Sequence, residues 1–272
     1  MKKLLSLAVV AVLGLGSLNA EVIISAGEKD KPFNKIAEKI KAKINRSDVS
    51  VIASKGSLDN LDNLIAGKAN VGLTFADSFM YKRASDPRAN DLKIVGTIGK
   101  GCMYAVAKKN GKVKDSGDLK KTGIIVDSGK VGAGANTTWS FMGTLDENFK
   151  NPEVQNIGGD MGLSSVISGM TDVTLQMLSP STTNNLVIDV LSNQDLKFVP
   201  FNSWAMNSKL PNGRAIYTKE EIVVANGRFR DTTLDTICTD TLIVANKDIS
   251  DADLNLVAGI VIRNTKELLG EK

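Results

Sequence analysis

The sequence predicts an α/β protein built as two lobes that are joined by two hinge crossings and face each other across a central cleft. Three observations lead to this prediction. Short apolar strands alternate with amphipathic helices, a helix–glycine–strand unit occurs twice, and two similar extended segments separate the units. Alternation of strands and helices favours a parallel sheet covered by helices. The repeat then indicates two lobes of related construction.

The first lobe opens with a strand over Val22–Ser25. Pro32 suits a first helical position, and apolar residues then recur at helical spacing. These residues are Phe33, Ile36, Ala37, Ile40 and Ile44. A second strand is predicted over Val49–Ala53 and a third over Val71–Phe75. Between them, Ser57 is predicted to cap a helix that Gly67 ends in the left-handed conformation.

Part of this pattern recurs further along the chain. Leu61–Ser78 aligns with Leu163–Pro180 at an offset of 102 residues, with five of 18 positions identical. The alternative is that two unrelated helix–glycine–strand units obey the same local constraints. We predict extended crossings near residues 98–108 and 236–246, a first lobe of residues 21–100 plus 240–272, and a second lobe of 101–239.

The chain is predicted to end on a helix that packs back on the first lobe. Ser250 and Asp253 resemble a capping box at its start. Two cysteines, Cys102 and Cys238, lie near the start of the two crossings. We predict two buried thiols there, with a disulfide as the open alternative, and no metal site, because two cysteines without histidine make a poor zinc site.

The first 20 residues predict an export signal. Lys2 and Lys3 precede an apolar run, Leu4–Leu15, that is shorter than the roughly 20 residues of a membrane helix. Cleavage near Ala20 would release the chain to the periplasm. A buried N-terminal helix is the alternative.

Composition excludes several classes of function. The chain has 272 residues, of which 42% are hydrophobic and 24% charged, an ordinary globular composition. Histidine is absent, which removes Ser-His and Cys-His nucleophile pairs. The 34 Lys and Arg nearly balance the 30 Asp and Glu, and aromatic residues make up only 5%. We therefore expect no nucleic-acid partner and no cofactor.

Three loops between strands and helices are candidates for ligand contact. Residues 54–60 hold Lys55, Ser57 and Asn60 at a helix start, where unpaired N–H groups attract anions. A plain turn with a cap is the favoured alternative for this loop taken alone. Residues 127–138 are glycine-rich, so a ligand can approach the backbone closely, and lack the nucleotide-binding spacing. For residues 158–165, a helix cap explains the sequence as well as ligand contact does.

Taken in order, these residues and several others resemble the type II periplasmic solute-binding proteins, and within them the TAXI group of TRAP-transporter receptors. The resemblance covers most of residues 22–268. It is carried by Gly56-Ser57, Asn60-Leu61, Gly67 with Asn70-Val71, Asp77, Asp118-Leu119, Ser168–Val173, Leu210–Gly213 with Tyr217, and Leu242–Asp248. Two segments depart from the family pattern, Gly27–Pro32 and Gly132–Asn136.

The resemblance implies a two-lobe fold of that type that closes on a small solute, often an amino acid or a dicarboxylate-like anion, and then docks on membrane permease subunits. Lys55 and Lys130 are candidates to balance a carboxylate. The full predicted ligand-binding set is Ser25, Lys55, Ser57, Asn60, Asp77, Ser128, Lys130, Gly134, Asn136, Thr137, Gln176 and Ser179.

The sequence therefore predicts an exported, monomeric, non-enzymatic receptor for a small polar, anionic solute that serves a TRAP-type transporter. A receptor of the same fold for an ABC importer or a sensor kinase is the first alternative. An exported enzyme that uses carboxylates in the cleft, Asp77 above all, is the second.

Overall fold

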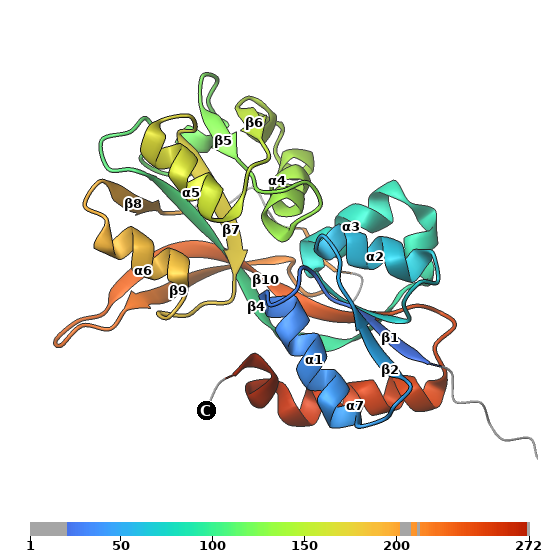
Figure 1. The fold of residues 1–272 in the computed structure, drawn as a ribbon. Coiled ribbons are helices and arrows are strands. Elements are labelled where there is room, and N and C mark those ends of the chain that lie inside the picture. The colour runs from blue at the N-terminus through green and yellow to red at the C-terminus, as the bar shows by residue number, and fades with distance from the viewer. Residues whose placement is uncertain (1–20, 202–207, 211–212, 271–272) are drawn as a thin grey trace, which may run out of the picture.

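The computed structural model describes residues 21–201, 208–210 and 213–270, so the predicted export signal lies outside the described residues. Figure 1 shows the two predicted lobes, with one curled sheet running through both. Its central strand order is β2-β1-β3-β10-β4-β7-β5-β6, with β8 paired to β4 and β9 paired to β10. Along the described residues, no helix has the length and apolar character needed to cross a bilayer.

The first lobe is a small parallel sheet with helices packed on it. In it, β1 pairs in parallel with both β2 and β3. Every helix and strand predicted for this lobe is present, and Gly67 has the left-handed backbone (φ 68°) predicted for it. The elements are β1 (Val22–Ser25), α1 (Pro32–Ile44), β2 (Val49–Ile52), α2 (Ser57–Ile65), β3 (Val71–Phe75), α3 (Ala76–Ser85), η1 (Pro87–Asp91) and α7 (Asp251–Leu269).

The second lobe repeats this plan. Its strand β5 pairs in parallel with β6 and β7, and the repeated helix–glycine–strand unit is α5, Gly169 and β7. Like Gly67, Gly169 has a left-handed backbone (φ 84°). The elements are η2 (Asp118–Lys120), β5 (Ile125–Asp127), α4 (Gly134–Leu145), η3 (Glu147–Lys150), β6 (Glu153–Gln155), α5 (Gly159–Ser168), β7 (Val173–Leu178), α6 (Asn185–Ser192), β8 (Leu196–Val199) and β9 (Tyr217–Ala225).

Two long antiparallel strands, β4 (Lys93–Lys108) and β10 (Thr232–Ala245), join the lobes. They confirm the predicted crossings and extend them at their starts. The register between them shifts near Asp240 and again near Ile243. Such bulges bend and twist a strand locally, which lets one sheet continue from one lobe into the other.

The two cysteines form a disulfide, so the prediction of two buried thiols is wrong. Cys102 lies on β4 directly opposite Cys238 on β10, with their Cα atoms 4.0 Å apart. The sequence placed each cysteine in a similar strand. It did not show that these two strands are neighbours.

The largest apolar core belongs to both lobes at once. It includes Leu61 and Phe79 from the first lobe, Met103 from a crossing strand, and Trp139 and Leu175 from the second lobe, all nearly excluded from water. Two further cores lie within single lobes. The lobes therefore pack against each other through apolar side chains as well as through the two strands.

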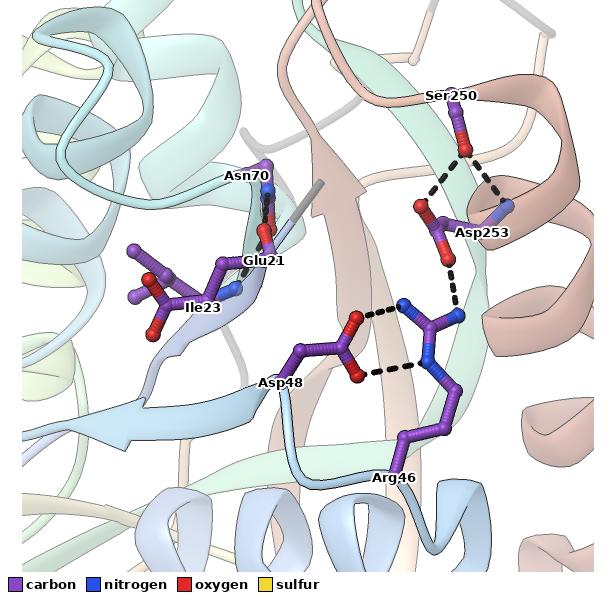
Figure 2. A network of polar contacts seen from close by, with 7 residues as sticks. All are labelled: Glu21, Ile23, Arg46, Asp48, Asn70, Ser250 and Asp253. Atoms are coloured by element: carbon purple, nitrogen blue, oxygen red, sulfur yellow. Dashed lines mark hydrogen bonds and ion pairs between the residues drawn. The ribbon is translucent and has the colours of Figure 1, made fainter. Parts of the chain in front are cut away.

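The terminal helix α7 packs on α1 in the first lobe, as predicted. Ser250 accepts a hydrogen bond from the Asp253 backbone N–H at 3.1 Å, so the predicted cap is confirmed. Figure 2 shows how Arg46 holds this helix start: its guanidinium donates to Asp253 at 2.6 Å and, through two nitrogens, to Asp48. The hydrogen bonds from Arg46 also lower the pKa of Asp48.

We expect the Arg46→Met variant to unfold at a thermal midpoint about 2–4 °C below the wild type. Without Arg46, the nearly buried Asp253 carboxylate loses its cationic partner. Thermal unfolding followed by circular dichroism measures the shift. Arg88→Met is the control, because Arg88 pairs with Asp86 on the open surface. Equal midpoints for the two variants would contradict the role assigned to Arg46.

Candidate functional site

A cavity of about 270 Å³ lies between the lobes. The loops that follow β1 and β2 line it from the first lobe, and those that follow β5 and β6 line it from the second. All four loops leave the carboxyl ends of parallel strands, the edge at which ligands bind in open α/β sheets. Parts of β7, and Phe75 at the end of β3, complete the wall.

Three helices from both lobes begin at this cavity. Ser57 at the start of α2, Gly134 at the start of α4 and Gly159 at the start of α5 all line it. None of these helices has a side-chain hydrogen bond at its N-cap. Backbone N–H groups without a side-chain cap and the positive ends of three helix dipoles therefore face one space, an arrangement that favours an anion.

The N-cap of α2 is Gly56, so the prediction that Ser57 caps this helix is wrong. Ser57 is the first helical residue, and its hydroxyl oxygen instead accepts a hydrogen bond from the Phe75 N–H at 3.4 Å. Gly56 has φ 132°, a conformation that side chains disfavour. It also lies against the second lobe, where a Cβ would come within 3.2 Å of the Ala133 Cα.

The lobes touch directly at two places beside the cavity. The Leu58 N–H donates to the Gly132 carbonyl oxygen at 3.4 Å, which joins the two backbones. Glu28 after β1 and Lys130 after β5 form an ion pair at 2.8 Å between partly exposed side chains. The two lobes are therefore in direct contact at the edge of the cavity.

The charged residues of the cavity lining are mostly basic. Lys31 and Lys55 from the first lobe join Lys130 from the second, and Glu28 is the one carboxylate that the described part of the chain contributes to the lining. Because Lys130 and Glu28 pair with each other, Lys31 and Lys55 supply the surplus positive charge. This charge adds to that of the helix N-termini.

Much of the remaining wall is apolar. The Phe75 ring lies 5.0 Å from that of Phe33, measured between centroids. Two glycines make room for it, since a Cβ on Gly101 or Gly134 would come within 2.3 or 2.4 Å of the Phe75 ring. The other apolar side chains of the lining are Pro32, Ile36, Ala133, Ala135, Leu175, Met177 and Leu178.

The structure places the predicted ligand-binding residues in two groups. Those that line the cavity are Lys55, Ser57, Lys130, Gly134, Gln176 and Ser179. Those that do not line it are Ser25, Asn60, Asp77, Ser128, Asn136 and Thr137. Each of the second group forms hydrogen bonds within the protein.

In the first lobe, Ser25 and Asn60 are fully buried. The Ser25 hydroxyl donates to the Asn60 Oδ1 at 2.7 Å, and the Asn60 Nδ2 donates to the Leu73 carbonyl oxygen at 2.6 Å. These bonds tie β1, α2 and β3 together. Asn60 therefore holds the loop that carries Lys55 rather than facing the cavity.

In the second lobe, Asn136 shapes the glycine-rich loop. Its Nδ2 donates to the Ser128 Oγ at 3.0 Å, and its Oδ1 accepts from the Gly132 N–H at 3.1 Å. The Thr137 hydroxyl donates to the Ala133 carbonyl oxygen one turn earlier in the chain. In this structure their side chains hold the backbone that faces the cavity.

Asp77 joins the lobes as a buried structural carboxylate. It is fully buried at the start of α3, and its Oδ2 accepts from the hydroxyls of Thr138 on α4 (2.5 Å) and Tyr217 on β9 (2.9 Å). Burial raises the pKa of Asp77 despite these hydrogen bonds, and burial beside Asp77 raises the pKa of Tyr217 well above its usual value. Because Asp77 does not line the cavity, the enzyme alternative loses its proposed carboxylate.

Phe33, Phe75 and Met177 line the cavity but are not in the predicted ligand-binding set, because apolar residues beside strands are typical of a core. Asp127 is not in that set either; it is fully buried, accepts hydrogen bonds from the Gly129 and Gly158 N–H groups and so holds two cavity loops together. The only signal for Asp127 was its position, since it is the first residue of the glycine-rich loop.

The fold and the site define a periplasmic solute-binding protein fold of type II. The chain belongs to the NMT1-like family, whose model matches residues 32–270. No curated protein matches the sequence.

Solved structures share the fold at low sequence identity. The amino acid ABC transporter substrate-binding protein AbpA of Streptococcus pneumoniae, bound to L-arginine, is 13% identical, with a TM-score of 0.52 over 92% of this chain and 91% of that one. The aliphatic sulphonate binding protein SsuA of Escherichia coli is 11% identical, with a TM-score of 0.50 over 93% and 80%. The BvgS periplasmic domain of B. pertussis is 12% identical, with a TM-score of 0.51 over 91% of this chain and 41% of that one.

Proposed function

We propose that this protein is an exported, non-enzymatic receptor that captures a small anionic solute between its lobes and delivers it to a membrane transporter. The observation that carries the proposal is the convergence of three uncapped helix N-termini and surplus lysine charge on one cavity between the lobes. Lys55, Ser57, Lys130, Gly134, Gln176 and Ser179 are the residues that we propose to contact the solute.

The proposed mechanism is closure of the lobes around the solute. An anion that bridges the α2 N-terminus of the first lobe and the α4 and α5 N-termini of the second is fully bound only when the lobes are closed. The solute therefore shifts the open–closed equilibrium by its difference in affinity for the two states. We propose residues 21–100 and 240–272 as one moving body and residues 101–239 as the other.

We further propose that the receptor is released to the periplasm by cleavage near Ala20, acts as a monomer, and serves a TRAP-type transporter of the TAXI group. The resemblance in sequence supports this assignment, whereas the structural neighbours include an ABC transporter substrate-binding protein and the BvgS periplasmic domain. Uptake of the identified solute by cells that carry this chain with TRAP membrane subunits tests the assignment. Uptake only with ABC subunits would contradict it.

Thermal unfolding with a panel of succinate, L-glutamate, 4-methylpentanoate and 3-phenylpropanoate tests the receptor function. A solute at 100 times its Kd stabilises the folded state by about 2.7 kcal/mol, which raises the midpoint of a chain of this size by about 5–10 °C. Lys55→Met should weaken binding of the active anion at least tenfold. Lys68→Met is the control, since the exposed Lys68 lies away from the cavity. A panel without any response would contradict the proposal.

A further inference from the structure

We propose that the solute is a compact monoanion with an apolar body and without an ammonium group, such as a branched-chain or aryl-substituted carboxylate. This inference rests on the proposed receptor function and narrows its substrate class. It follows from the apolar side chains of the lining, the volume of the cavity and the lack, among the residues that the structure describes there, of a carboxylate suited to an ammonium group.

A large part of the lining is hydrocarbon. Phe33 and Phe75 contribute to it from the first lobe, and Leu175, Met177 and Leu178 contribute from β7. A dicarboxylate would place its second charge against this surface, where an unpaired ion is strongly disfavoured. An apolar body is instead removed from water there, which gains about fourfold in affinity for each buried methylene.

The cavity volume sets the size of that body. A cavity of about 150 Å³ accommodates benzene, whereas pockets for drug-sized ligands span roughly 300–1,000 Å³. The volume of about 270 Å³ therefore suits one ring or a short branched chain together with one carboxylate or sulphonate.

The lining also argues against an amino acid. Among the described lining residues, Glu28 is the sole carboxylate, and it is already paired with Lys130. Lys31 and Lys55 add positive charge on the same side, which repels an ammonium group. The α-ammonium of an amino acid would thus be desolvated without an anionic partner, while its carboxylate bound the helix N-termini.

Isothermal titration calorimetry with two matched pairs tests the inference. The protein is unfolded, dialysed and refolded to remove any copurified solute. It is then titrated with 3-phenylpropanoate against L-phenylalanine and with 4-methylpentanoate against L-leucine, which differ by the ammonium group alone. 3-Phenylpropanamide removes the negative charge, and glutarate replaces the apolar body with a second carboxylate.

We expect at least one of the two ammonium-free acids to bind at least tenfold more tightly than its amino acid, than the amide and than glutarate. Equal or tighter binding of the amino acids or of glutarate would overturn the inference and leave the receptor function standing. Absence of binding by every acid would instead overturn the receptor function itself.

Variants of the apolar wall supply a second readout. Met177→Gln keeps the length of the side chain and should weaken the preferred acid at least fivefold without weakening glutarate. Met170→Gln is the matched control, because Met170 is 62% exposed and lies away from the cavity. If the Met177→Gln variant does not fold, Phe33→Gln is the alternative variant of the apolar lining. An unchanged Kd for the preferred acid in a folded wall variant would contradict the apolar contact.

Discussion

The double variant Cys102→Ala/Cys238→Ala is expected to lose about 3–5 kcal/mol of unfolding free energy. The disulfide joins residues 136 positions apart, so it excludes many extended conformations of the unfolded chain. Both cysteines are fully buried in the core of the second lobe, so the folded protein should resist reductant. Denaturant unfolding followed by fluorescence, with the slope checked for two-state behaviour, measures the loss.

A reductant distinguishes the stability contributed by the disulfide bond from the stability contributed by the packing of the two sulfur atoms. Adding dithiothreitol to the denaturant series should lower the wild-type midpoint towards that of the double variant and leave the variant unchanged. If reductant left the wild-type unfolding midpoint unchanged, the disulfide would be contradicted. Alkylation of the denatured, unreduced protein should modify no cysteine.

The Asp77→Ala variant is expected to lose about 3–4 kcal/mol. Removing the carboxylate leaves the buried hydroxyls of Thr138 and Tyr217 without their acceptor, and each such group costs about 1–3 kcal/mol. Chemical unfolding measures the loss. Thr144→Ala is a control, because the hydroxyl of the exposed Thr144 bonds within its own helix. A loss in Asp77→Ala as small as that of the control would show that Asp77 does not join the lobes.

The pH dependence of Asp77→Asn tests the same carboxylate without creating a void. Burial raises the pKa of Asp77 in the folded state above its unfolded value near 3.8. Between these two pKa values the folded state binds the extra proton, so the contribution of Asp77 to stability falls as pH rises. The Asn variant lacks this decline, and its stability relative to the wild type should therefore increase from pH 4 towards pH 7. A constant difference would contradict the raised pKa.

These contacts also bear on lobe closure, because Asp77 belongs to the first lobe and Thr138 and Tyr217 to the second. Opening the cleft between α3 and α4 has to break or stretch the bond from Thr138. We therefore expect folded Asp77 variants to populate the open state more than the wild type does. A larger radius of gyration in small-angle scattering would reveal this shift.

The local helices, caps and turns follow from the residue pattern alone. The helix over residues 32–44, the cap formed by Ser250 and Asp253, and the repeated helix–glycine–strand unit all depend on neighbours within about one to three turns. Hydrophobic periodicity and turn residues report such short-range constraints directly. The order of strands and helices was sufficient to predict two lobes joined by two crossings.

Contacts between residues that are far apart along the chain depend on how the elements pack. It paired Cys102 with Cys238, turned Asn60 and Asp77 into buried structural contacts, and brought Phe33 and Met177 to the cavity. The physical reason is that a polar side chain in a loop binds whichever partner the packing presents, and an apolar one faces whichever space is left. Neither outcome is encoded in local spacing.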